Sequence, residues 1–256
     1  QSDTTGTITV QGGSGSEVRI TYSPGGTELG DSSFVAGDTL ELFASQFDAS
    51  QNFLGLVEGD WTISPTNLGR FENGTNTITD SIVRFQAYRI GSGNIQLDFS
   101  GQTDVTGLLT VTLGPADSII IRDQANGGGL PYRSQTVNIT TDSSITLYAA
   151  HYDAMGNFRN DAAVGWSSTT ISGNGLVPVP AGPVSQITFR PTLPGSGTII
   201  TTSPTLVNDT TGTITVTTGD LEYIVIQNSG GSEIWNSTLT AGETVNIFSA
   251  TYDRHN

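Results

Sequence analysis

One eight-residue block, present three times, constrains this chain more than any other feature of its sequence. The block reads DTTGTITV at Asp3–Val10 and returns in closely related form at Asp104–Val111 and Asp209–Val216. Successive copies begin 101 and 105 residues apart. That period is far longer than a solenoid unit and matches a whole β-sandwich domain. The sequence therefore predicts a tandem array of such domains.

Two further signals keep the same period. The block AGDTLELFASQFD at 36–48 matches TDSSITLYAAHYD at 141–153 and AGETVNIFSATYD at 241–253. Trp61 and Trp166 are 105 residues apart, in step with the blocks. A tryptophan at a repeated mid-strand position is typical of the core between two sheets. We therefore expect both tryptophans to be structural core residues.

Alternation of apolar and polar residues within the second block predicts β-strands. One face carries the core side chains in all three copies: Leu40, Leu42, Ile145, Leu147, Val245 and Ile247. The aromatic residue at positions 47, 152 and 252 falls out of phase by one, which predicts a β-bulge. Helical periodicity is absent from the sequence. We expect an all-β fold of tandem Ig-like antiparallel β-sandwich domains, with roughly seven strands per period.

The order of the blocks within one period sets the expected domain boundaries. Residues 1–13 are expected to be the last strand of a preceding Ig-like domain, and 220–256 the opening strands of an incomplete one. Residues 14–114 and 115–219 are expected to be two complete Ig-like domains. An incomplete sandwich exposes a strand edge. Two interpretations stay open: the chain is a window of a longer protein, or residues 5–10 of a neighbouring copy pair there.

Charge and missing residue types argue against several classes of function. The formal net charge is −15 and the nine basic residues are scattered arginines, so nucleic acid is not expected as a partner. Cysteine is absent, which excludes thiolate catalysis and cysteine-ligated zinc. His151 and His255 are not at equivalent repeat positions, and no Ser-His-Asp set can be assembled around them. No apolar run approaches the ~20 residues that cross a bilayer, so neither catalysis nor membrane insertion is expected.

Each complete period carries an aspartate and an asparagine four residues apart, Asp48/Asn52 and Asp153/Asn157. Their oxygen atoms suit Ca²⁺, but the same residues also form Asx turns that bind their own backbone. The turn is favoured because each loop offers a single carboxylate, and no other cofactor is expected. Four N-x-[ST] sequons are candidate glycosylation positions: Asn73, Asn138, Asn208 and Asn236.

The run Tyr152–Phe158, followed by Val164–Ser167, resembles the bacterial Ig-like repeat modules of invasin- and intimin-type surface proteins. Those modules carry a D-x-x-G-N turn and then a V-x-W/F-S strand. The first copy of the motif departs from the pattern, because Gln51 stands where glycine is usual. The resemblance covers both complete periods at the level of strand pattern.

The resemblance implies a structural, extracellular cell-surface role, as a stalk, a fibre, or a subunit of a surface layer or filament. Neighbouring copies or domains of the same protein are the implied partners. Two alternatives stay open. The chain is the stalk of an adhesin whose binding domain, with its host or cell-surface ligand, lies outside this segment, or it supplies accessory domains of a secreted hydrolase.

Overall fold

The computed structural model describes residues 1–169 and 182–254. The chain divides into two compact units, which are Gln1–Pro115 with Asp153–Asn157, and Ala116–Tyr152 with Phe158–Asn256. Strands form the regular structure of both units, and the one helical element in the described part is the three-residue η1, Tyr132–Ser134. The all-β fold predicted from the alternation is confirmed.

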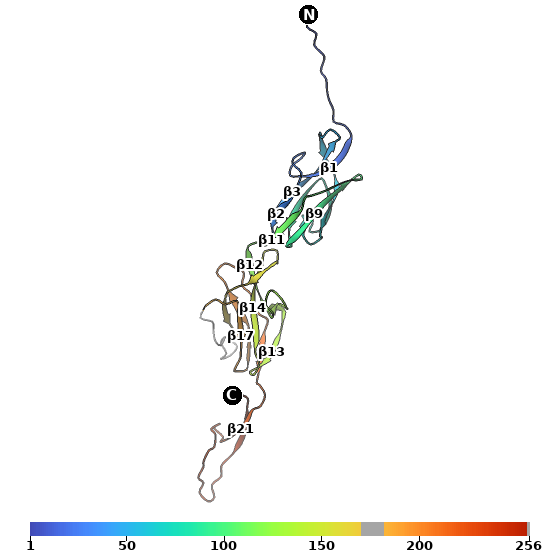
Figure 1. Ribbon diagram of the computed structural model, residues 1–256. Helices are drawn as coiled ribbons and strands as arrows, with labels where there is room; N and C mark the ends of the chain where they lie inside the picture. The colour runs from blue at the N-terminus through green and yellow to red at the C-terminus, as the bar shows by residue number, and fades with distance from the viewer. Residues whose placement is uncertain (170–181, 255–256) are drawn as a thin grey trace. The chain divides into compact units, whose positions relative to one another are not determined.

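Unit 1 contains two sheets, traced from blue to green in Figure 1. The first sheet has the order β1-β3-β8-β6, with β4 on β3: β1 Gly15–Thr21, β3 Thr39–Asp48, β4 Phe53–Leu56, β6 Gly69–Phe71 and β8 Ile82–Ala87. The second has the order β2-β11-β9-β5-β7, with β10 on β9: β2 Ser32–Val35, β5 Gly59–Ser64, β7 Thr77–Asp80, β9 Gly91–Phe99, β10 Gln102–Val105 and β11 Leu109–Thr112.

The core of unit 1 lies between these two sheets, as the Ig-like sandwich requires. Leu42 and Phe85 enter it from the first sheet, and Trp61 and Leu97 from the second; each is at most 1% exposed. Leu40 is half-buried and packs against the same cluster. The alternation of apolar and polar residues in the sequence therefore correctly predicts which face of β3 packs against the core.

Up to residue 219, unit 2 contains nine described strands, which form three sheets of four, three and two strands. They are β12 Ala116–Arg122, β13 Val137–Thr140, β14 Ile145–Asp153, β15 Phe158–Asp161, β16 Gly165–Ser168, β17 Gln186–Phe189, β18 Gly195–Gly197, β19 Ile199–Thr202 and β20 Ile214–Thr217. Leu147 is fully buried and Trp166 is 8% exposed within one apolar cluster, against which the half-buried Ile145 packs. The third copy of the DTTGTITV block, in β20, pairs in parallel with β13, as β11 pairs with β2.

The predicted bulge is confirmed in the first two copies but not in the third, where β22 pairs in continuous register up to Tyr252. The β3–β4 register shifts between Gln46 and Phe47, and the β14–β15 register shifts between His151 and Tyr152. The expected seven strands per period is too low, because the first period alone contains eleven strand segments, six of them of four residues or fewer. Frequent turns divide what the alternation counts as single strands.

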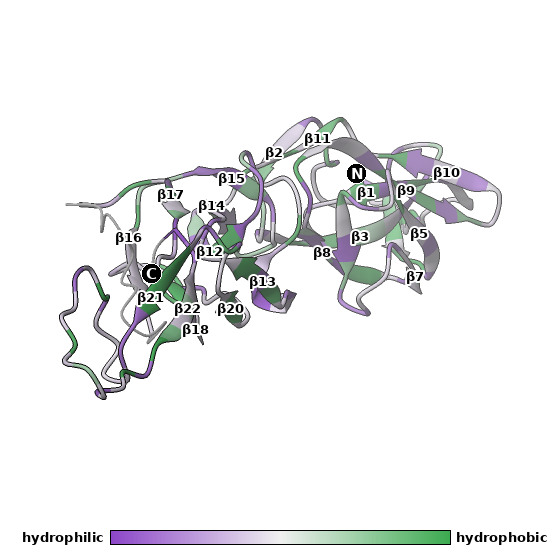
Figure 2. Cartoon of the chain, turned by 90° about the horizontal axis from the view of Figure 1, so that it is seen from below, coloured by the Kyte–Doolittle hydropathy of each residue, from purple (hydrophilic) through white to green (hydrophobic). Residues whose placement is uncertain are grey.

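Residues after 219 form a two-stranded sheet of β21 Tyr223–Gln227 and β22 Phe248–Tyr252. The apolar β21 is green in Figure 2, and Ile224 is 69% exposed. The expectation that Val245 and Ile247 face the core is wrong in this structure, where they precede β22 and are 41% and 61% exposed. Among the described residues of this segment there is no second sheet to cover them.

Candidate functional site

The Asp-x-x-x-Asn pairs lie at equivalent strand ends, where β3 and β14 finish. The Oδ1 atom of Asp48 accepts the backbone N–H groups of Ser50 and Asn52, both at 2.9 Å. The amide of Asn52 also donates to this carboxylate, with Nδ2 3.0 Å from Oδ2. Asp153 and Asn157 repeat the same turn, with 2.9 Å between Asn157 N and Asp153 Oδ1. The pairs therefore form Asx turns.

The Oδ2 atom of the aspartate in each turn accepts a hydrogen bond from the chain segment that precedes the first strand of that repeat. Three hydrogen bonds, here called the Asp–Gly clamps, run from a glycine N–H to an aspartate Oδ2: Gly13 to Asp48 at 2.8 Å, Gly114 to Asp153 at 3.1 Å and Gly219 to Asp253 at 2.9 Å. Each clamp joins residues of a single unit. The repeat seen in the sequence is thus also a repeat of one polar contact.

Close approach explains why glycine stands at the donor position. A Cβ atom on Gly114 would lie 2.9 Å from the backbone oxygen of Ala36 and 3.2 Å from Cβ of Asp153. A Cβ atom on Gly219 would overlap the carboxylate of Asp142. A larger residue at Gly114 would force the leading segment away from Asp153, whereas at Gly219 the Asp142 side chain would have to move.

The second and third clamps are reinforced by further hydrogen bonds. In unit 1, Asn157 Nδ2 donates to the carbonyl of Tyr88 at 2.8 Å, and Arg89 donates to the carbonyl of Gly156 at 2.9 Å. In unit 2, the Thr141 hydroxyl donates to Asp253 Oδ2 at 2.6 Å. The Thr141–Asp253 hydrogen bond is buried and charge-assisted, and such bonds are stronger than neutral ones.

The carboxylates of Asp48 and Asp153 are held in their charged form. Hydrogen bonds from the Asn52 side chain, and then from the backbone of Gly13 and Asn52, lower the pKa of Asp48 to about 2 from the ordinary 3.8. For Asp153, burial pushes the pKa upward, but the hydrogen bonds from Asn157, Gly114 and Met155 together outweigh it, so its pKa is also lowered.

These turns do not fit a calcium ligand set. N–H donors already point at both oxygens of Asp48 and of Asp153. The described residues also contain no group of three or more Asp, Glu, His or Cys side chains placed to hold a metal ion. Because Ca²⁺ takes six to eight oxygen ligands, the geometry assigns these aspartates to the backbone instead.

The lowered pKa values predict how the clamps respond to acid. A depressed carboxylate pKa stabilises the folded state above the unfolded value, near pH 4, and this contribution is lost as the pH falls toward 2. In an NMR titration, the Gly13 amide proton is expected to shift with a midpoint near pH 2. Asp48→Asn is the control and should abolish that transition. A Gly13 midpoint near 4 would contradict the clamp.

Sequence reasoning missed a second aspartate contact, made by the eight-residue block itself. Asp104 Oδ2 accepts the N–H of Ile20 at 2.7 Å, and Asp209 Oδ2 accepts the N–H of Ile121 at 2.8 Å. The start of the block, just before the last strand of each complete period, is therefore hydrogen-bonded to the first strand, β1 or β12. The threefold recurrence of the aspartate was the available signal, but the alternation of apolar residues does not reveal a polar partner.

The four sequon asparagines are all exposed, and Asn73 lies in the turn between β6 and β7. His151 is half-buried in β14, where burial and then Arg159 lower its pKa. His255 lies outside the described residues. Trp235, which has no counterpart in the other repeats, is 80% exposed. No helix in the described part is long and apolar enough to cross a membrane.

A scan against models of protein families gives no match, and a search of curated proteins gives none either. Among solved structures, domains 5–6 of the S-layer protein SbsC are 15% identical, with a TM-score of 0.28 over 80% of this chain and 98% of that one. The adhesin InvE of Yersinia pseudotuberculosis is 13% identical, with a TM-score of 0.28 over 77% and 63%. A C-terminal fragment of intimin is 14% identical, with a TM-score of 0.26 over 85% and 67%. These TM-scores are too low to carry an argument about function.

Proposed function

We propose that this chain is part of a structural, non-enzymatic protein outside the cell, in which tandem Ig-like modules form a stalk, a fibre or a surface lattice. The Asp–Gly clamps carry this proposal. They recur once per period and bind the leading chain segment rather than a ligand. A hydrogen bond from a carboxylate to the backbone, repeated in every period, stabilises a repeat that bears mechanical force. A catalytic site would instead leave the carboxylate free to contact a substrate.

The clamps act on the part of a tandem repeat protein that is usually least ordered. A connecting segment without hydrogen-bond partners is mobile, because fixing each backbone residue costs about 1–2 kcal/mol. The buried carboxylates of Asp153 and Asp253 offset that cost at Gly114 and Gly219. We infer that the clamps keep the chain segments at Gly13, Gly114 and Gly219 ordered under load.

Single-molecule force spectroscopy tests this role. Pulling the chain from its ends is expected to give successive unfolding events, each releasing at most about 33–36 nm for a module of about 100 residues. Asp153→Ala is expected to lower the unfolding force of the event that includes the clamp. Thr146→Ala, which changes a half-buried residue of the same strand that takes no part in the clamp, serves as the control.

Two results would contradict the proposal. One is gradual extension at low force without discrete events, which a mechanical module does not show. The other is turnover of a saccharide, peptide or ester substrate that a single carboxylate substitution within residues 14–219 abolishes. Surface labelling of intact source cells with an antibody against the chain tests the placement outside the cell, and labelling only after lysis would refute it.

A further inference from the structure

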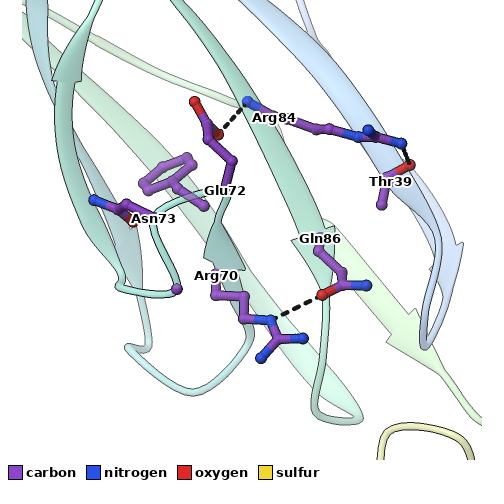
Figure 3. Close-up of a pocket in the computed structure, with 8 residues that line it drawn as sticks. Thr39, Arg70, Glu72, Asn73, Arg84 and Gln86 are labelled. Carbon is purple, nitrogen blue, oxygen red and sulfur yellow. Dashed lines mark hydrogen bonds between the residues drawn. The ribbon is translucent and has the colours of Figure 1, made fainter.

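A shallow groove of about 550 Å³ lies on the outer face of unit 1, across β3, β8 and β6 (Figure 3). Its polar lining, here called the arginine groove, comes from six residues: Thr39, Arg70, Glu72, Asn73, Arg84 and Gln86. The groove is separate from the Asp–Gly clamps and shares no residue with them. Its volume falls within the range of small-molecule sites.

The strand register brings these side chains together. Gln86 of β8 faces Thr39 of β3 on one side and Arg70 of β6 on the other, so the three residues form a row across the sheet. Arg84 lies two residues before Gln86 and therefore points to the same face. Figure 3 shows Arg84 reaching toward Thr39 while Arg70 turns toward Gln86.

Both guanidinium groups are oriented by neutral partners. Arg70 Nε donates to Gln86 Oε1 at 2.8 Å, and its guanidinium lies 5.1 Å from the centre of the Tyr88 ring. Arg84 Nη2 donates to the Thr39 hydroxyl at 3.0 Å. Among the described residues, neither arginine forms an ion pair with a carboxylate. Their positive charges are therefore fixed in place but not neutralised by contact.

In the described part of the chain, the nearby carboxylates of Glu41 and Glu72 form no ion pair with these arginines. Glu72 accepts the backbone N–H of Arg84 at 2.7 Å. Glu41 stands opposite Arg84 in the register, yet the Arg84 side chain bonds Thr39 instead. Two unpaired guanidiniums in one groove are notable in a chain with only nine basic residues and a net charge of −15.

The fold does not require an arginine at position 84. In the second period, Thr188 takes the corresponding place, pairing with Thr146 of β14 as Arg84 pairs with Glu41 of β3. Strand β17 forms with threonine there. The arginine groove is therefore a property of unit 1 added to the shared sandwich.

We propose that the arginine groove binds a short acidic saccharide of the uronic acid type. Guanidinium groups recognise carboxylates by paired, charge-assisted hydrogen bonds. The Nε2 group of Gln86, whose Oε1 already accepts Arg70, adds a donor for a sugar hydroxyl group. A protein partner is disfavoured because a stable interface covers about 800 Å² on each side. The net charge of −15 repels long polyanions, which favours a short or terminal acidic sugar.

This ligand site does not depend on the structural role proposed above, because a stalk module performs that role whether or not its groove is filled. NMR titration of the ¹⁵N-labelled chain with trigalacturonic acid tests it. The amide signals of Arg84, Gln86 and Asn73 are expected to shift, whereas maltotriose, a neutral sugar of the same length, should shift none of them.

Two substitutions locate the site. Arg84→Thr installs the residue of the second period and is expected to weaken trigalacturonate binding at least about tenfold, the loss of a charge-assisted contact. Arg190→Thr removes the same charge from an exposed position in unit 2, and binding should stay within twofold of the unmodified chain. If Arg84→Thr disturbs the fold by its amide spectrum, Arg70→Gln replaces it.

Four outcomes would overturn the proposal. Absence of any shift at millimolar trigalacturonate would show that the groove does not bind the acidic sugar. Equal binding of maltotriose would show that the carboxylate groups of the sugar are not needed. Equal binding of citrate would show that any carboxylate suffices and that the sugar is not recognised. Unchanged affinity in the Arg84→Thr and Arg70→Gln variants would place the binding elsewhere.

Discussion

Replacing Trp61 by alanine is expected to lower the free energy of unfolding of unit 1 by about 3–5 kcal/mol. The side chain is 1% exposed between the two sheets, and its ring lies edge-on to Phe71 with 6.5 Å between the ring centres. The substitution removes this packing and also leaves the carbonyl of Asp80 without the indole N–H that it accepts at 2.9 Å.

Trp235→Ala is the matched control, because Trp235 is 80% exposed and its loss should change stability by no more than about 0.5 kcal/mol. Hydrogen exchange resolved by peptide measures both variants. In Trp61→Ala, protection should fall in β5, which contains Trp61, and in β9, which pairs with it. Wild-type protection of these strands would show that the tryptophan is not a core residue.

Most of the fold could be predicted from the repeat period and from the alternation of apolar and polar residues, because both reflect which residues are buried. Trp166 and Leu147 fall at the predicted core positions of unit 2, since a residue between two sheets must be apolar wherever the repeat recurs. The same reasoning failed for Val245 and Ile247. Alternation states which face is apolar, but burial also needs an opposing sheet, and the described part of residues 220–256 contains none.

The candidate sites were only partly predictable. The Asx turns are local, with all their residues within a span of five, and sequence spacing therefore found them. Gly13 lies 35 residues from Asp48, and Gly114 lies 39 from Asp153, so only the fold brings each pair together. The arginine groove is less predictable still, because its row of side chains depends on the pairing of three strands rather than on any motif.

Replacing Gly212 by alanine is expected to destabilise unit 2 by about 3 kcal/mol, near the upper end of the usual cost of overpacking. Gly212 is the glycine of the eight-residue block, and its N–H donates to the carbonyl of Tyr132 at 2.8 Å. An added Cβ would overlap the carbonyl oxygen of Gln135 and lie 3.2 Å from that of Tyr132. Both obstacles are backbone atoms, which cannot turn aside as a flexible side chain would.

The same block provides its own control, since Gly6 is the equivalent glycine of the first copy and a Cβ there would have nothing within 4 Å. Gly6→Ala should leave the urea midpoint unchanged, while Gly212→Ala lowers the midpoint of the transition in which β13 and β20 lose protection. The contrast separates two reasons for a recurring glycine. If both variants behave alike, the glycine serves the conformation of the block; if only Gly212→Ala is destabilised, it serves the contact between the last strand and the segment before β13.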